Sequence, residues 1–154
     1  MTTRSDAFNK GLRNIVEPVL NDHGFKFDKS RTFRRVCHNE DFSEIINFQL
    51  GQRSTEGTFT VNLAVFVDGD ADNISVTKAL EYHCKPSRRE RLRSLMPNWT
   101  SVLAGKPILR RWFPATTDKW WKFSENEKFT QKQQAKVLQE IMTYGIPWLE
   151  SNVP

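Results

Sequence analysis

The sequence predicts an α+β fold in which an antiparallel sheet meander is flanked by an N-terminal and a C-terminal helix. Two observations lead to this class. Apolar residues recur at three- and four-residue steps near both ends of the chain, which is typical of amphipathic helices. Between these ends, three segments alternate apolar and polar residues, and the short turn-rich links between them favour antiparallel hairpins. The 154 residues suit a single domain spanning 1–154.

The first helix is predicted at Ser5–Asp22, with Ser5 as its N-cap and Gly24 as its C-terminal stop. Pro18 lies inside this span. Because proline has no amide proton, it is predicted to kink the helix or to end its regular part early. The apolar residues of this helix are Phe8, Leu12, Ile15, Val16, Val19 and Leu20.

Three strands are predicted at Thr32–Cys37, Phe42–Leu50 and Thr58–Val67. Their register follows from the alternation, because a slip of one residue would turn every apolar side chain away from the core. Pairing Leu50 with Phe59 brings the apolar sides of the second and third strands together.

The first of these strands is placed by the same reasoning. Pairing Phe33 with Ile46 continues the apolar face. This register also sets Arg35 opposite Glu44, where the two side chains can form an ion pair.

The register gathers polar residues on the opposite face of the sheet. It sets Gln49 opposite Thr60 and Asn47 opposite Asn62. The resulting polar face consists of Thr32, Arg34, Asn47, Gln49, Thr60 and Asn62.

The remaining elements are predicted from caps and stops. Ser87 and Glu90 have the spacing of a capping box, which predicts a short helix over residues 87–96. The sequence PILRRWF, residues 107–113, is predicted to be a strand.

The last helix is predicted over residues 124–145. Ser124 and Glu127 repeat the capping-box spacing, and Gly145 and Pro147 are expected to end the helix. Its apolar stripe is Phe129, Val137, Leu138, Ile141 and Met142.

Several of these pieces follow one another in a recognisable order. GFKFDKSRTFRR comes after the first helix, and INFQ, FTVNLAVF, RRERL and DKWW follow before the last helix. This ordered set resembles the bacterial domain-of-unknown-function family 4304, over a span from Leu12 to Trp148. The resemblance implies an α+β fold and a bacterial or phage setting, and it implies no reaction and no catalytic residue. It directs attention to Asn47, Gln49, Asn62, Arg91, Asp118, Trp120 and Trp121.

The polar face is the first candidate binding site. Amide side chains both donate and accept hydrogen bonds, so a cluster beside Arg34 can hold a carboxylate, a phosphate or a peptide backbone. The alternative is the ordinary wet face of an antiparallel sheet. Amides in place of Lys and Glu favour a partly covered face, because a net charge is costly to desolvate. The candidate ligand-binding residues are Arg34, Asn47, Gln49, Thr60 and Asn62.

Positive charge is concentrated in residues 85–122. They carry ten Lys and Arg against two carboxylates, or +8, and so leave −3 on the rest of a chain whose net charge is +5. Arginines on phosphates with aromatic rings on bases are typical of nucleic-acid binding, whereas tryptophans in the core and arginines on a solvated helix face are the alternative. The candidate nucleic-acid site is Arg88, Arg89, Arg91, Arg93, Arg110 and Arg111, interleaved with Trp99, Trp112, Trp120 and Trp121.

No motif assigns a metal, a cofactor or a catalytic residue. Cys37 and His38 are neighbours on a strand and would point to opposite faces, so they are poorly placed to share a metal ion. The acidic sequence DGDAD, residues 68–72, lacks the spacing of a calcium loop. A phosphate-cradling glycine pattern and a nucleophile elbow are both absent. A catalytic dyad assembled in three dimensions stays open.

The cellular setting is predicted from what the sequence lacks. No apolar run approaches the roughly 20 residues of a membrane helix. The N-terminus has no signal-peptide pattern, and two cysteines do not make a disulfide framework. We therefore expect a cytoplasmic protein without a membrane partner.

The functional hypothesis is a non-catalytic binding domain that recognises a protein or a small anionic ligand on the polar face. Nucleic-acid binding through residues 85–122 is the alternative. A toxin-neutralising or phage-related protein partner is suggested by analogy with compact bacterial chains of this size. No cofactor is expected.

Overall fold

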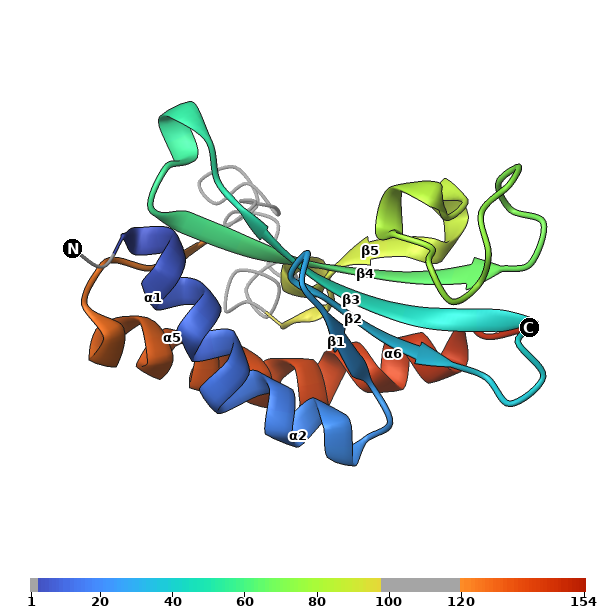
Figure 1. Ribbon diagram of the computed structural model, residues 1–154, viewed down its shortest axis with the longest axis horizontal. Coiled ribbons are helices and arrows are strands. Elements are labelled where there is room, and N and C mark those ends of the chain that lie inside the picture. Colours follow the sequence, from blue (N-terminus) through green and yellow to red (C-terminus); the bar gives the residue numbers. More distant parts are fainter. Residues whose placement is uncertain (1–2, 98–119) are drawn as a thin grey trace, which may run out of the picture.

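The computed structural model describes residues 3–97 and 120–154, which form an antiparallel sheet with long helices packed on one side (Figure 1). Within these residues the strand order is β1-β2-β3-β4-β5, and β6 pairs with the beginning of β4. The predicted α+β class, with helices at both ends of the chain, is confirmed. The strands are β1 (Lys26–Asp28), β2 (Thr32–Val36), β3 (Phe42–Leu50), β4 (Thr58–Val67), β5 (Arg89–Arg91) and β6 (Trp121–Lys122).

The register of the central strands agrees with the prediction. β3 and β4 have the predicted bounds, and β2 ends one residue early, at Val36. Leu50 lies opposite Phe59, and Asn47 lies opposite Asn62. The pairs Gln49–Thr60, Phe33–Ile46 and Arg35–Glu44 are also present. The apolar alternation was sufficient to determine which residues face one another.

Phenylalanine rings form the centre of the core between the sheet and the helices. The ring centroid of Phe8 lies 4.9 Å from those of Phe59 and Phe123 and 6.3 Å from that of Phe48. These contacts are edge-to-face, the arrangement that the ring quadrupole favours. The first helix is therefore held to β3, β4 and the segment before the last helix at one point.

An ion pair lies at the rim of the same core. Arg35 donates from Nε to Glu44 Oε2 at 2.5 Å and from Nη2 to Glu44 Oε1 at 2.8 Å. Its guanidinium stacks 4.6 Å from the ring centroid of Phe25 and donates to Glu150 at 3.2 Å. The hydrogen bond from Arg35 to Glu44 raises the pKa of the arginine above its ordinary value, although burial opposes this.

The N-terminal helix begins earlier than predicted. It runs through α1 (Arg4–Gly11), a π-helical turn (Leu12–Val16) and α2 (Glu17–Asp22). The N-cap is Thr3 rather than Ser5, because Thr3 and Asp6 form the capping box. Pro18 does not end the helix, but the regular α-helical winding stops before it and a π-helical turn takes its place, which agrees with the predicted early end of the regular part.

The C-terminal helix departs further from its prediction. It runs through α5 (Glu127–Glu140), a π-helical turn (Ile141–Gly145) and α6 (Ile146–Ser151). Its N-cap is Asn126, whose Oδ1 accepts from the amide of Phe129 at 3.1 Å. The predicted cap at Ser124 and the predicted end at Gly145 and Pro147 are therefore wrong. Phe129 is also 40% exposed, so it is not part of the buried stripe.

The two π-helical turns explain why neither proline ends its helix. The amide of Glu17 bonds the carbonyl of Leu12, and the amide of Ile146 bonds that of Ile141, each five residues back. Proline has no amide proton, and its ring would clash with the carbonyl four residues earlier in an α-helix. In both helices the widened turn directly precedes the first α-helical residues, where proline is tolerated.

The two helices approach closely where Gly11 meets Gln134. The buried Gln134 donates from Nε2 to the carbonyl of Phe8 at 2.9 Å. A Cβ atom on Gly11 would lie 1.8 Å from Gln134 Oε1, so this position has no room for a side chain.

Substituting Gly11→Ala is expected to destabilise the protein, although alanine is the better helix former. The helix propensity gains about 1 kcal/mol. Displacing Gln134 removes its buried hydrogen bond and costs about 1–3 kcal/mol, so the net loss is about 1 kcal/mol. Urea denaturation measures this loss. In a Gln134→Ala background the same substitution should become stabilising, and a loss of equal size there would contradict the steric account.

The predicted short helix over residues 87–96 is wrong in its first half. A 3-10 turn (Pro86–Arg88) is followed by β5, and only α3 (Leu92–Leu95) is helical. The Glu90 carboxylate accepts from Ser94 Oγ and not from a cap at Ser87. The edge of β4 offers backbone hydrogen bonds to this segment, and these outweigh the local helical pattern.

Several predictions fall outside the described residues. They are the strand over residues 107–113, the arginines Arg110 and Arg111, and the positions Trp99, Trp112 and Asp118.

Candidate functional site

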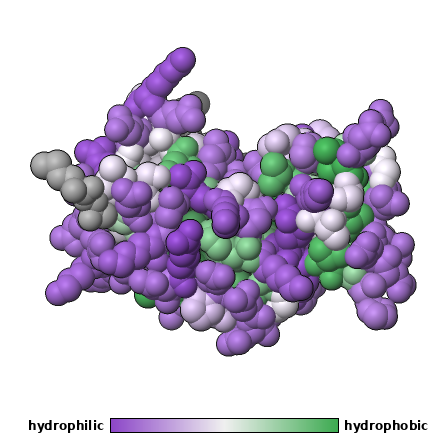
Figure 2. Space-filling view, in the orientation of Figure 1, coloured by the Kyte–Doolittle hydropathy of each residue, from purple (hydrophilic) through white to green (hydrophobic). Residues whose placement is uncertain are grey.

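The face of the sheet opposite the helices divides into an apolar end and a polar end. Residues 68–88, drawn in light green in Figure 1, cross over the apolar end and are named here the covering segment. Hydrophobic residues appear in Figure 2 mainly in the right-hand part of the view, in the region where the covering segment lies in Figure 1. A second, smaller core lies beneath it, formed by Ile45, Ala64, Phe66, Val76, Ala79 and Cys84.

At the polar end, three amides form a relay of hydrogen bonds. Asn62 donates from Nδ2 to Gln49 Oε1 at 2.9 Å and to Asn47 Oδ1 at 3.4 Å. Asn47 in turn donates from Nδ2 to Thr32 Oγ1 at 3.0 Å. The structure therefore brings together the three amides that the register placed on one face, with Gln49 exposed and the two asparagines half-buried.

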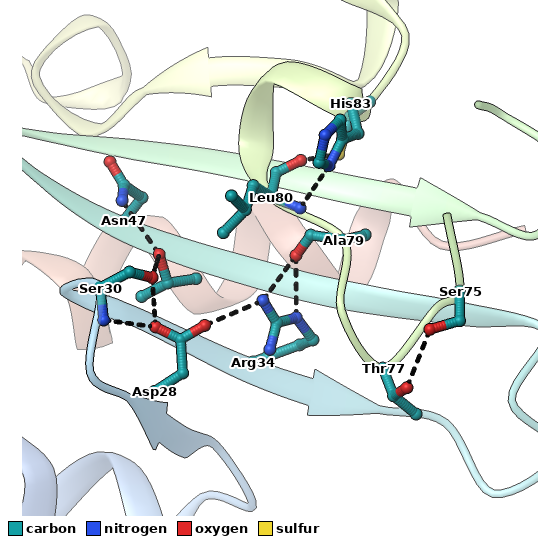
Figure 3. A network of polar contacts seen from close by, with 11 residues as sticks. Asp28, Ser30, Arg34, Asn47, Ser75, Thr77, Ala79, Leu80 and His83 are labelled. Carbon is teal, nitrogen blue, oxygen red and sulfur yellow. Dashed lines mark hydrogen bonds and ion pairs between the residues drawn. The ribbon is translucent and has the colours of Figure 1, made fainter. Parts of the chain in front are cut away.

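Two other residues of the predicted ligand site are buried. Arg34 is 8% exposed and donates from Nε and Nη2 to the carbonyl of Ala79, at 2.9 and 2.6 Å, and from Nη2 to Asp28 at 3.1 Å (Figure 3). Thr60 is fully buried, and its Oγ1 has no hydrogen-bond partner in the described part of the chain. Arg34 thus holds the covering segment against the sheet.

A second arginine fixes the other end of the covering segment. Arg88 pairs through Nη2 with both carboxylate oxygens of Asp70 and donates from Nε to the carbonyl of Val65 at 3.3 Å. The Asp70 side chain is 4% exposed. Burial raises the pKa of this carboxyl, but hydrogen bonds from Arg88 and the Val67 amide bring it below its ordinary value. Arg88 is therefore engaged within the protein.

β5 brings two further arginines to this face of the sheet, one at the polar end and one where the polar end meets the apolar end. Arg91 lies opposite Asn62 and Arg89 lies opposite Ala64. Because cross-strand partners point to the same face, both arginine side chains share the face of the amide relay. Arg89 is exposed, and the guanidinium carbon of Arg91 lies 5.7 Å from the ring centroid of Trp120. Arg93, by contrast, lies in α3, with Nη1 3.9 Å from Met96 Sδ.

These residues line an open pocket of about 540 Å³, named here the amide–arginine pocket. Tyr82, from the 3-10 turn Glu81–His83 of the covering segment, stands at the pocket with 61% of its surface exposed. Two carboxylates, of Glu81 and Glu90, also line it, and the second accepts from Ser94 Oγ at 2.6 Å. The pocket residues are Gln49, Asn62, Leu63, Glu81, Tyr82, Pro86, Arg89, Glu90 and Arg91.

The described residues offer little for metal or thiol chemistry. No group of three His, Cys, Asp or Glu side chains with metal-binding geometry occurs in residues 3–97 and 120–154. Cys37 and Cys84 are free thiols, and burial raises the pKa of Cys84 to about 12. Its thiolate, the reactive form, is therefore scarce near neutral pH. None of the described helices combines the length and the hydropathy needed to cross a membrane.

The model of the protein family described as "Domain of unknown function (DUF4304)" matches residues 16–151. The chain belongs to this family. The resemblance noted in the sequence is thereby confirmed. Searches of curated proteins and of solved structures gave no match. Because the family description states no activity, the function of this DUF4304 domain has to be argued from its own site.

Sequence reasoning treated the amides and the arginines as rival sites, whereas the DUF4304 fold places them side by side. It also missed Tyr82, which lies in a segment without periodicity. The signal for Arg89 and Arg91 was present in the alternation of "RERL", in which the two arginines lie on one side and the buried Leu92 follows. The ligand-binding role of the predicted residues stays a prediction.

Proposed function

We propose that this DUF4304 domain is a binding module that takes up a small anionic ligand in the amide–arginine pocket. The observation that carries the proposal is the position of Arg89 on the face of the Asn62–Gln49 amides, in an open pocket. A volume of about 540 Å³ is within the range of roughly 300–1,000 Å³ that small-molecule sites occupy.

The charges of the pocket favour a ligand with one anionic group. Arg89 is exposed and makes no ion pair with the described residues, so its guanidinium can bind a carboxylate or phosphate through two parallel hydrogen bonds. The carboxylates of Glu81 and Glu90 also line the pocket and would repel further negative charge.

Nucleic-acid binding is the second candidate, and one observation favours it. The exposed ring of Tyr82 lines the same pocket as Arg89, a combination that can stack a base and hold a phosphate. Two observations argue against a long contact with a phosphate backbone. Arg88 is already paired with Asp70, and the two carboxylates of the pocket would repel phosphates. A nucleic-acid chain would therefore be bound at one nucleotide and not along the whole basic segment, residues 85–122.

The substitution Arg89→Ala tests the proposed site. We expect inorganic phosphate, succinate or ribose 5-phosphate to shift the side-chain amide NMR signals of Gln49 and Asn62. Removing the guanidinium should weaken that binding by about tenfold to a hundredfold, because this is the change in affinity that the loss of a hydrogen bond to a charged group causes. The matched control is Arg13→Ala, at an exposed arginine on the helix side of the molecule. Equal weakening in both variants would reject the site and leave only a general effect of charge.

A further inference from the structure

Among the described residues, one donor group and one acceptor atom of the amide relay make no hydrogen bond. Asn62 uses both hydrogens of Nδ2, one for Gln49 Oε1 and one for Asn47 Oδ1. Within residues 3–97 and 120–154, Gln49 Nε2 and Asn62 Oδ1 make no hydrogen bond. Both belong to amides that line the pocket, and the 2.9 Å bond between them keeps the two groups adjacent. The two hydrogen-bonded amides that line the pocket therefore leave a donor and an acceptor available to a ligand.

A neighbouring donor and acceptor recognise a ligand that carries the complementary pair. A carboxylate or phosphate only accepts, so it satisfies Gln49 Nε2 and leaves Asn62 Oδ1 unpaired. The edge of a nucleobase carries a ring acceptor beside an exocyclic donor, which is why Asn and Gln side chains recognise adenine in nucleic-acid complexes. A primary amide carries the same pair, but it has no aromatic face.

The remaining features of the pocket favour a nucleobase over an amide as the ligand. Tyr82 exposes 61% of its surface, and its ring lies 4.3 Å from that of His83 in a tilted arrangement that supports it. An exposed ring at a pocket provides a stacking surface for a base. Arg89 lies on the same face as Asn62 and supplies the phosphate contact.

We infer that the ligand of the amide–arginine pocket is a nucleotide. Gln49 and Asn62 bind the edge of its base, Tyr82 stacks on the base, and Arg89 binds its phosphate. This inference rests on the proposed function, because it names the ligand class of the same site. The adjacent donor and acceptor match the ring acceptor and the amino group of adenine, so AMP is the probe of choice.

The test compares AMP with ribose 5-phosphate, which has the phosphate and the sugar but no base. By isothermal titration calorimetry, AMP should bind the wild-type domain at least about tenfold more tightly. Gln49→Glu keeps the acceptor for Asn62 and replaces the free donor by a carboxylate oxygen. This variant should clearly lower the ratio of the two affinities, while stacking on Tyr82 keeps the ratio above one. Gln139→Glu makes the same change of charge on an exposed residue of α5 and should leave the ratio unchanged.

The outcomes distinguish failure of the inference from failure of the proposed site. If ribose 5-phosphate binds as tightly as AMP, and Arg89→Ala weakens both, the site stands and the nucleotide is rejected. Tighter binding of N-acetylglutamine, which has a primary amide and one carboxylate, than of AMP would likewise reject the base and identify an amide ligand. If no probe perturbs Gln49 and Asn62, both proposals fail. An oligoadenylate that binds more tightly than AMP identifies a nucleotide within a strand, and equal or weaker binding identifies a free nucleotide.

Discussion

Substituting Arg35→Ala is expected to cost about 3–5 kcal/mol of the free energy of unfolding, the largest loss that a single charged residue should cause here. Removal of the guanidinium leaves the buried carboxylate of Glu44 without its two hydrogen bonds. It also removes the stacking on Phe25 and the contact with Glu150, which joins β2 to α6. Urea denaturation at neutral pH measures the loss.

Two variants show whether the unpaired carboxylate is the cause. The double substitution Arg35→Leu with Glu44→Leu removes both charges and should recover most of the stability, because apolar residues can replace a buried ion pair at little cost. Arg13→Ala, at an exposed site, should change stability by no more than about 0.5 kcal/mol. A double variant as unstable as Arg35→Ala would show that packing and not charge determines the loss.

The second large effect is expected for Phe8→Ala, at about 3–5 kcal/mol. Phe8 is fully buried and its ring contacts those of Phe48 in β3, Phe59 in β4 and Phe123 in the segment between β6 and α5. Alanine would leave a cavity at the point where the first helix meets the sheet. Thermal or urea denaturation followed by circular dichroism provides the measurement.

Phe129→Ala is the matched control for this prediction. It makes the same substitution on a helix, but Phe129 is 40% exposed. Alanine is also the better helix former, so we expect a change within about 0.5 kcal/mol in either direction. If Phe129→Ala destabilised the domain as much as Phe8→Ala, the assignment of these two residues to surface and core would be incorrect.

The central strands were predictable from the sequence because each of them alternates over a long run. In β3 and β4, one choice of face settles every pair from Leu50–Phe59 to Asn47–Asn62. β5 has only three residues, and it is a strand because the edge of β4 lies beside it. The capping-box spacing of Ser87 and Glu90 is a local signal, and local signals carry no information about a partner strand.

The amides of the site could be predicted, and their surroundings could not. The register that the apolar alternation predicts is enough to place Asn47 and Asn62 on one face. The burial of Arg34 depends on the carbonyl of Ala79, which belongs to a covering segment with no periodic pattern. For the same reason, no pattern in the sequence indicates that Tyr82 lines the same pocket as Arg89.

The widened turns before Pro18 and Pro147 have a consequence for how this family tolerates changes in chain length. A hydrogen bond that spans five residues instead of four encloses one residue more than the α-helix needs. Removing a single residue from either turn would leave the buried sides before and after it in phase, but ordinary α-helical winding has no room for the proline ring, so the proline would have to be replaced as well. The same deletion in the middle of α5 would rotate every later side chain by about 100° away from the sheet. Single-residue gaps should therefore accumulate at these two places, in family members that lack the proline.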